Sequence, residues 1–250
     1  MKFTIITLFP NVIQEYINTS IISNAIKKDI LQIEIGDLRN FGKGKRRNTD
    51  DTVYGGGTGM VLTVPVLDKA LSSINLDNAK IIYLSPKGKT FTQDVAKEYA
   101  KNCEHIVLIC GHYEGVDERI FKLYDICEVS IGDYVLTGGE LPALAILDSV
   151  ARLTPGVLKQ DAVSNETFEA GLLEEAQYTK PLEYKGLKVP DILVSGNHEL
   201  VNEYRLEDRI YTTYLKRPDM LTKYIEHNKL NKEKIKQIVA KKEGKQNGYN

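Results

Sequence analysis

Two glycine-bearing segments hold polar residues that could bind a small ligand. The first reads Gly111-His112-Tyr113-Glu114-Gly115 and follows an apolar run that ends at Cys110. Glycine lets the backbone approach a ligand closely, and Glu114 and the amides of this turn could address a polar one. In open α/β sheets, ligands bind outside the carboxyl ends of the strands. The segment therefore favours a binding site, although strand–turn–helix segments are also common scaffolding.

The second segment, from Ser130 to Pro142, leads into an apolar helix. Gly138-Gly139 supplies a tight entry, and Pro142 suits a first helical turn. The helix is apolar on most faces, which predicts burial inside the domain or against another subunit. Asp148 and Arg152 lie four residues apart on it and could form a simple ion pair. An arginine in so apolar a helix is better explained if it serves a site nearby.

The stretch from Arg39 to Arg47 is strongly basic. It carries five positive charges, no acidic residue and one aromatic residue. Such a stretch is typical of a loop that contacts phosphate, and the alternative is a solvated loop without a ligand.

Two further glycine motifs fail as nucleotide signatures. Gly88-Lys89-Thr90 resembles the end of a phosphate-binding loop, but the glycine required five positions earlier is Tyr83. Gly55 to Gly59 resembles a dinucleotide fingerprint, but its third glycine would fall on Met60. The glycine loop still permits close approach of backbone to a ligand.

The composition is that of an ordinary globular protein. The 250 residues are 42% hydrophobic and 27% charged, which excludes a fibrous or disordered chain. The formal net charge is −1, so any nucleic-acid binding must come from local basic patches. Three cysteines without a Cys-x-x-Cys pair favour neither a disulfide framework nor a metal site, and we expect a cytoplasmic protein. The N-terminal apolar run is too short for a signal peptide, and no stretch is long enough to span a membrane.

Short β-rich runs alternate with helical patterns over the first 150 residues, which predicts a mostly parallel sheet with helices on both faces. Thr154-Pro155-Gly156 is a stop signal, a polar linker follows, and the chain beyond Pro190 is helical and increasingly basic. The predicted strands are Phe3–Leu8, Leu31–Ile35, Lys80–Leu84, His105–Cys110 and Ile126–Ser130, and the predicted helices include Asn11–Tyr16, Val64–Ser72, Gln93–Lys101, Asp117–Leu123 and Glu140–Leu153.

Taken together and in this order, the segments resemble the bacterial tRNA (guanine-N1)-methyltransferases of the trefoil-knotted SPOUT superfamily. The resemblance runs from residue 1 to about residue 220. The matching pieces are Thr7–Pro10, Asp50-Asp51, Tyr54–Met60, Tyr83–Pro86, Gly111–Arg119, Ser130–Pro142, Pro155–Leu158, Tyr178–Pro181 and Ser195–His198.

The resemblance implies an α/β fold whose parallel sheet contains a deep trefoil knot, an exception to the rule against knots. It implies a knotted catalytic domain over 1–158, a flexible linker over 159–180 and a small helical tRNA-binding domain over 181–250. It further implies a homodimer whose active sites are shared between subunits. The implied reaction transfers a methyl group from S-adenosyl-L-methionine to N1 of guanosine 37, 3′ of the anticodon, in tRNAs with a preceding guanosine.

The resemblance also assigns roles to residues. Arg152 matches the family's catalytic arginine, and Glu166 in Asn165-Glu166-Thr167-Phe168 aligns with an aspartate that serves as the general base. Asp161 and Glu169 are alternative bases, and a Mg²⁺ requirement is left open, with no metal site predicted. The expected cofactor-binding residues are Tyr83, Leu84, Ser85, Pro86, Gly111, Glu114, Ile131, Gly132, Asp133, Tyr134, Val135, Leu136, Gly138 and Gly139.

We expect the tRNA contacts to come from three places in the sequence: the basic stretch, the glycine loop and the start of the C-terminal helices. Two other functions fit the same residues: methylation of another RNA atom, such as a ribose 2′-oxygen, and tRNA binding without catalysis. The expected tRNA-binding residues are Lys43, Lys45, Arg46, Arg47, Tyr54, Gly57, Ser195, Asn197 and His198.

Overall fold

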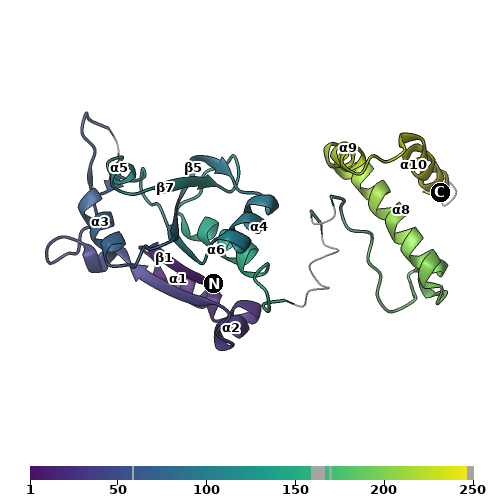
Figure 1. Ribbon diagram of the computed structural model, residues 1–250, viewed down its shortest axis with the longest axis horizontal. Coiled ribbons are helices and arrows are strands. Elements are labelled where there is room, and N and C mark those ends of the chain that lie inside the picture. Colours follow the sequence, from purple (N-terminus) through teal and green to yellow (C-terminus); the bar gives the residue numbers. More distant parts are fainter. Residues whose placement is uncertain (58, 159–166, 169–170, 247–250) are drawn as a thin grey trace. The chain divides into compact units, whose positions relative to one another are not determined.

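The structure is a computed structural model that describes the chain except residues 58, 159–166, 169–170 and 247–250 and the side chains of residues 245 and 246. Contacts within the chain group it into two compact units, Met1–Gln160 and Asp161–Asn250. Figure 1 labels the helices of both units and strands β1, β5 and β7 of the first. No helix among the described residues has the length and apolar character needed to cross a bilayer.

The first unit is built on a five-stranded sheet in the order β2-β1-β6-β5-β7. Every neighbouring pair in this sheet is parallel. The mixed α/β fold with a parallel sheet is thereby confirmed, and each predicted strand is present with ends shifted by a few residues at most, apart from a longer β5. The strands are β1 (Lys2–Thr7), β2 (Gln32–Asp37), β5 (Ala79–Thr90), β6 (His105–Ile109) and β7 (Ile126–Ser130).

Helices cover both faces of the sheet because neighbouring strand residues point to opposite sides. On β1, Ile5 packs into one apolar cluster with helices α1, α2, α4 and α6, while Ile6 packs into the other with α3 and α5. Nearly all of these side chains are removed from water, which is the main source of the fold's stability. The helices are α1 (Pro10–Ile17), α2 (Ser20–Lys27), α3 (Val64–Ser72), α4 (Gln93–Asn102), α5 (Ile120–Leu123) and α6 (Glu140–Ala151).

Strand β5 is interrupted where it passes β7. Leu84 and Lys89 both pair with Val129, so residues 85–88 form a bulge within the strand. Pro86 fits there because proline within a sheet is confined to edges and bulges. A β-carbon on Gly88 would lie 2.3 Å from the Val129 nitrogen, so only glycine lets the two strands come this close.

Some elements of the first unit lack a clear signal in the sequence. Helix α2 begins at Ser20, whose backbone has a φ of 53°, so α1 and α2 are separated by a sharp bend. The basic stretch starts in a short 3₁₀ helix, η1 (Leu38–Phe41). Strands β3 (Asp50–Thr52) and β4 (Met60–Leu62) form an antiparallel pair on either side of the glycine loop.

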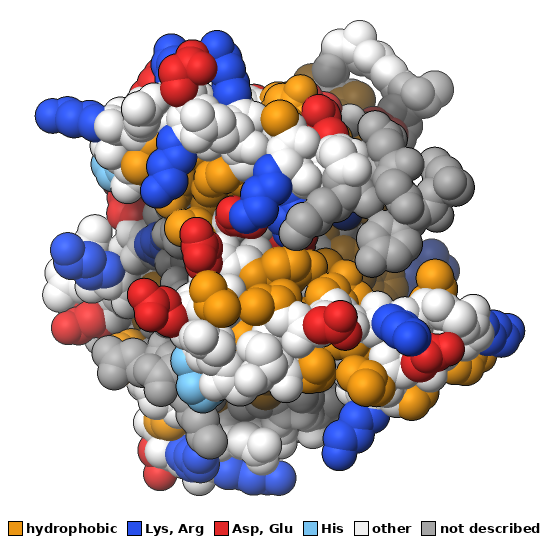
Figure 2. All heavy atoms as spheres, turned by 90° about the vertical axis from the view of Figure 1, so that its right-hand side faces the viewer, with side chains coloured by type: hydrophobic (Ala, Val, Ile, Leu, Met, Phe, Trp, Pro, Cys, Tyr) orange, Lys and Arg blue, Asp and Glu red, His pale blue; other side chains and the backbone are white. Residues whose placement is uncertain are grey.

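The described residues of the second unit form a small hairpin, a short 3₁₀ helix and three α-helices. Residue 172, inside the predicted linker, belongs to this unit: Leu172 is 1% exposed and packs with Ile210, Leu221 and Ile235. Figure 2 shows Lys, Arg, Asp and Glu side chains spread over the face in view, with hydrophobic side chains gathered near its middle. The elements are β8 (Glu183–Tyr184), β9 (Leu187–Lys188), η2 (Asp191–Val194), α8 (His198–Lys216), α9 (Pro218–His227) and α10 (Lys232–Gln246).

The packing of Leu172 gives a stability prediction. Leu172→Ala should lower the free energy of unfolding by about 2–5 kcal/mol, because it removes buried methyl groups and leaves a cavity. The matched control is Leu187→Ala. Leu187 is 77% exposed, so its truncation should lower the free energy of unfolding only slightly. Urea unfolding followed by circular dichroism measures both, and equal stabilities would show that residue 172 is not part of the helical core.

Candidate cofactor cavity

A cavity of about 390 Å³ lies at the carboxyl ends of β6 and β7 and beside the middle of β5, where its pairing with β7 is interrupted. Parallel strands end at the same edge of a sheet, and this edge is where ligands bind in open α/β folds. The cavity gathers the expected cofactor-binding residues from three separate segments, with Asp133 as the exception. Those lining it are Tyr83, Leu84, Ser85, Pro86, Gly111, Glu114, Ile131, Gly132, Tyr134, Val135, Leu136, Gly138 and Gly139.

Close backbone packing shapes one wall of the cavity. The amide of Gly139 donates to the carbonyl of Gly111 at 2.9 Å, which ties the start of α6 to the end of β6. A β-carbon on Gly139 would lie 2.6 Å from the Cys110 Cα, and one on Gly138 would lie 2.2 Å from the His112 ring. Real β-carbons do not approach other atoms this closely, so both positions require glycine.

The turn after β6 forms another part of the lining. Tyr113 has a φ of 59°, an uncommon backbone conformation for a residue other than glycine. The amide of Glu114 donates to the Met60 carbonyl at 2.9 Å, which connects the turn to β4. A β-carbon on Gly59 would lie 2.5 Å from Glu114 Cγ, so the glycine loop packs against a side chain that lines the cavity.

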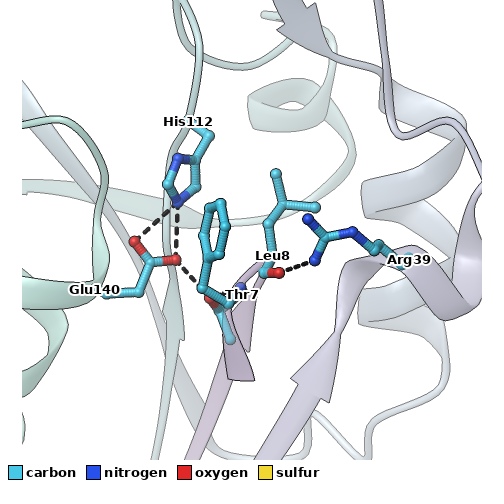
Figure 3. Close-up of polar contacts among 6 residues, drawn as sticks. Thr7, Leu8, Arg39, His112 and Glu140 are labelled. Atoms are coloured by element: carbon cyan, nitrogen blue, oxygen red, sulfur yellow. Dashed lines mark hydrogen bonds and ion pairs between the residues drawn. The ribbon is translucent and has the colours of Figure 1, made fainter. Parts of the chain in front are cut away.

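A buried polar cluster lies beside the glycine wall (Figure 3). Glu140 is 6% exposed, and both of its carboxylate oxygens are 2.8 Å from Nε2 of His112. The Thr7 hydroxyl donates to Oε1 of Glu140 at 2.5 Å and accepts from the amide of Phe9 at 2.8 Å. The sequence alone assigns no role to Thr7, His112 or Glu140. Thr7 and Glu140 are 133 positions apart, so the sequence carries no local signal for their contact.

The basic stretch connects to this cluster through its first residue. The guanidinium of Arg39 donates to the Leu8 carbonyl and lies 5.3 Å from the centre of the Phe9 ring. The Phe9 ring in turn lies 4.9 Å from the ring of His112. The basic stretch therefore starts close to the cofactor cavity.

Burial keeps two groups near the cavity protonated. Burial, with a smaller effect from the Glu128 and Glu118 charges, raises the pKa of Tyr83 to about 12, so its phenol stays neutral near pH 7. Burial and the nearby Glu140 charge raise the pKa of Cys110 well above its usual value. A thiol must ionise to act as a nucleophile, so Cys110 serves as a packing group.

Arg152 lies away from the cavity of its own chain. It is the C-terminal capping residue of α6, while the cavity-lining glycines precede the first residue of that helix. At 1.5 Å per residue, the two ends of this helix are about 18 Å apart. Within one chain, this arginine therefore lies at the opposite end of α6 from the cavity-lining glycines.

Glu166 lies outside the described residues, as do the alternative bases Asp161 and Glu169. Its neighbour Thr167 is described: the amide of Thr167 donates to Oε1 of Glu174 at 3.0 Å, and the amide of Glu174 donates to the Thr167 hydroxyl at 3.2 Å. Leu173 then donates from its amide to the hydroxyl of Thr213 at 2.9 Å. These bonds attach the chain just after Glu166 to the helical unit.

The expected tRNA-binding residues fall into three surface segments. Lys43, Lys45, Arg46 and Arg47 form a tight exposed turn, and within the described part of the chain neither Lys45 nor Arg46 makes an ion pair. Tyr54 is fully exposed in the loop that also contains Gly57. Ser195, Asn197 and His198 form the start of α8, where the Asn197 side chain caps the helix by accepting from the Leu200 amide at 3.2 Å.

Metal ligands are not grouped in the part of the chain that the structure describes. No set of three or more His, Cys, Asp or Glu side chains there is arranged to hold a metal ion.

Comparison with known proteins decides the family. Residues 1–223 match the sequence model of the family described as tRNA (Guanine-1)-methyltransferase TrmD. This chain belongs to that family. The match includes all three segments of the cavity and the arginine at the end of α6, and it confirms the family resemblance of the sequence.

Individual family members are similar over nearly their whole length. The tRNA (guanine-N(1)-)-methyltransferase of Mycoplasma capricolum is 48% identical over 246 residues, which cover 98% of this chain and 100% of the relative. The enzymes of the same name from Malacoplasma penetrans and Clostridioides difficile are 47% and 46% identical over 228 residues. They cover 91% and 89% of this chain and 100% and 98% of their own lengths.

Gly111 provides a test of the cavity in this family member. A β-carbon there would lie 2.6 Å from the Tyr83 hydroxyl, so a side chain would first displace Tyr83 rather than meet a ligand directly. Gly111→Val should abolish measurable S-adenosylmethionine binding in calorimetry while the protein stays folded. Gly36→Ala is the matched control, because its β-carbon meets only ordinary contacts of 3.8 Å or more. Normal affinity for S-adenosylmethionine in Gly111→Val would show that this cavity is not the cofactor-binding site.

Proposed function

We propose that this chain transfers a methyl group from S-adenosyl-L-methionine to N1 of guanosine 37 in tRNAs with a preceding guanosine. The observation that carries the proposal is that the cavity gathers the three segments expected to bind the cofactor. The proposal includes the trefoil knot in the first unit, a helical tRNA-binding domain formed by the second, and a cytoplasmic location alongside the tRNA substrate. Family membership supports each of these points.

The cavity fits S-adenosylmethionine in size and in chemistry. A volume of about 390 Å³ is within the usual range for small-molecule sites. The lining combines the backbone of Gly111, Gly138 and Gly139 with apolar side chains such as Leu84 and Leu136. Backbone groups there could hydrogen-bond the adenine and ribose while the apolar side chains cover the ring. When bound, the cofactor supplies a methyl group on a positively charged sulfur.

The chain must then supply a base and a positive charge. Guanine N1 carries a proton and is a poor nucleophile until that proton leaves, so transfer needs a general base within hydrogen-bond reach. We assign this role to Glu166, with Asp161 and Glu169 as the competing carboxylates. Negative charge spreads to guanine O6 as the proton leaves, and we assign to Arg152 the role of stabilising this charge.

The position of Arg152 supports a homodimer. The arginine and the glycine wall lie at opposite ends of α6 in one chain, about 18 Å apart. A guanine is much shorter than this distance, so we assign the arginine and the cavity of one active site to different chains. In a symmetric dimer, the arginine of one subunit could complete the cavity of its partner.

The surface charges suggest how tRNA is held. Lys43, Lys45, Arg46 and Arg47 project from one turn, and a protein gains affinity for RNA when such cations displace counterions from phosphate. Tyr54 and Gly57 lie in the neighbouring loop, where an exposed aromatic ring offers a surface for base stacking. We assign Ser195, Asn197 and His198 to a second contact at the start of α8.

The direct test is methyl transfer from labelled S-adenosylmethionine to tRNA transcripts. A transcript with guanosines at positions 36 and 37 should be labelled at N1 of guanosine 37, and one with adenosine at position 36 should be labelled far less. The N1-methyl group blocks Watson–Crick pairing, so primer extension locates it. A parallel reaction with a chelator determines whether Mg²⁺ takes part.

Two outcomes would contradict the proposal. A methyl group on a ribose 2′-oxygen leaves base pairing intact, so it does not stop primer extension in the way that an N1-methyl group does. Label found there would indicate a different RNA methyltransferase. Tight tRNA binding with no transferred label would indicate a tRNA-binding protein without catalysis.

The base assignment makes a separate prediction. Glu166→Gln should lower the single-turnover rate by about 10²-fold or more, the usual contribution of a general base, and leave S-adenosylmethionine affinity unchanged. Asp161→Asn and Glu169→Gln are matched controls in the same segment. A near-normal rate in Glu166→Gln together with a collapse in either control would assign the base to the other carboxylate.

A further inference from the structure

A buried carboxylate in the first unit has no role in the chemistry proposed above. Glu140 is 6% exposed and is not among the residues that line the cavity. Burying a carboxylate is costly unless hydrogen bonds replace its water. Here Thr7 and His112 supply those bonds, and Thr7 itself is fully buried.

The direction of each hydrogen bond in the cluster follows from chemistry. Glu140 accepts from the Thr7 hydroxyl, and the His112 tautomer with its proton on Nε2 donates the second hydrogen bond to this carboxylate. The Thr7 hydroxyl has one proton, which it gives to Glu140, and its oxygen accepts from the Phe9 amide. The cluster therefore connects the end of β1, the end of β6 and the start of α6 through groups with fixed donor and acceptor roles.

The cluster also supports the glycine wall of the cavity. His112 lines the cavity, and a β-carbon on Gly138 would lie 2.2 Å from its Cε1 and 2.7 Å from Oε2 of Glu140. Gly138 thus packs directly on the His112–Glu140 pair, and the adjacent Gly139 bonds to Gly111. A change in the pair would shift the backbone that forms this wall.

We propose that Thr7 and Glu140 are positioning residues for the methyl donor. They hold His112 and the Gly138–Gly139 turn in the shape that binds S-adenosylmethionine, without touching the cofactor themselves. This inference rests on the proposed function, because it takes the cavity to be the cofactor site.

The test compares two buried threonines on the same strand. Thr7→Val removes the hydroxyl that serves Glu140, and Thr7→Ser keeps it. Thr4→Val is the matched control: Thr4 is 3% exposed, and its hydroxyl lies 2.9 Å from Nε2 of His105, at the opposite end of β6 from the cavity. Thr4→Val loses a buried hydrogen bond to a histidine, and Thr7→Val loses a buried hydrogen bond to a carboxylate. If both bonds are purely structural, the two variants should have the same affinity for S-adenosylmethionine.

We expect Thr7→Val to weaken S-adenosylmethionine binding in calorimetry by about tenfold, or about 1.4 kcal/mol. Thr7→Ser and Thr4→Val should bind within about twofold of the unchanged protein, because a bond of this kind contributes little away from the cavity. All three variants should keep their tRNA affinity, since the cluster contacts no expected tRNA-binding residue.

Glu140→Gln provides an independent measurement if Thr7→Val does not fold. It keeps the size of the side chain but cannot accept from Thr7 and His112 in the same way, and it should also weaken cofactor binding by about tenfold. Cofactor affinities in Thr7→Val and Glu140→Gln equal to that of Thr4→Val would overturn the inference. Failure of the unchanged protein to bind S-adenosylmethionine would instead contradict the proposed function.

Discussion

The close approach of backbone to backbone at Gly139 is the constraint on which the cofactor cavity depends. A side chain there would overlap Cys110 and Gly111, so the start of α6 can meet the end of β6 only through glycine. That contact places Gly138 on His112 and Glu140, and it brings the third cavity segment next to the second. The same principle acts at Gly88, whose contact with Val129 accompanies the bulge that brings residues 85–87 into the cavity lining.

The site is divided between parts of the molecule that have different physical requirements. The cofactor cavity belongs to a tightly packed sheet whose strands β1 and β6 are almost fully buried. The proposed base precedes Thr167, which is tied to the helical unit through Glu174, and the proposed arginine lies at the far end of α6. The proposed reaction needs the guanine to reach the cofactor, the base and the arginine together.

Much of the fold could be predicted from the sequence because its strands and helices have strong periodic patterns. Val64–Ser72 and Ile126–Ser130 have the predicted ends, since proline or turn residues mark them. Helix α2 follows α1 after only two residues, Asn18 and Thr19, so the turn signal between the two helices is very short. The cavity segments were predicted from family motifs, but the contact of Thr7 with Glu140 and the distance of Arg152 from its own cavity depend on tertiary structure.

The shared site is tested most directly by mixing two inactive variants. Gly111→Val lacks a working cavity, and Arg152→Ala lacks the arginine. In a mixed dimer, the intact cavity of one chain meets the intact arginine of the other, so random exchange of subunits should restore about a quarter of the original sites. The account predicts that methyl transfer to tRNA returns on mixing, after denaturation and joint refolding, while each variant alone stays inactive. A mixture as inactive as its components would contradict it.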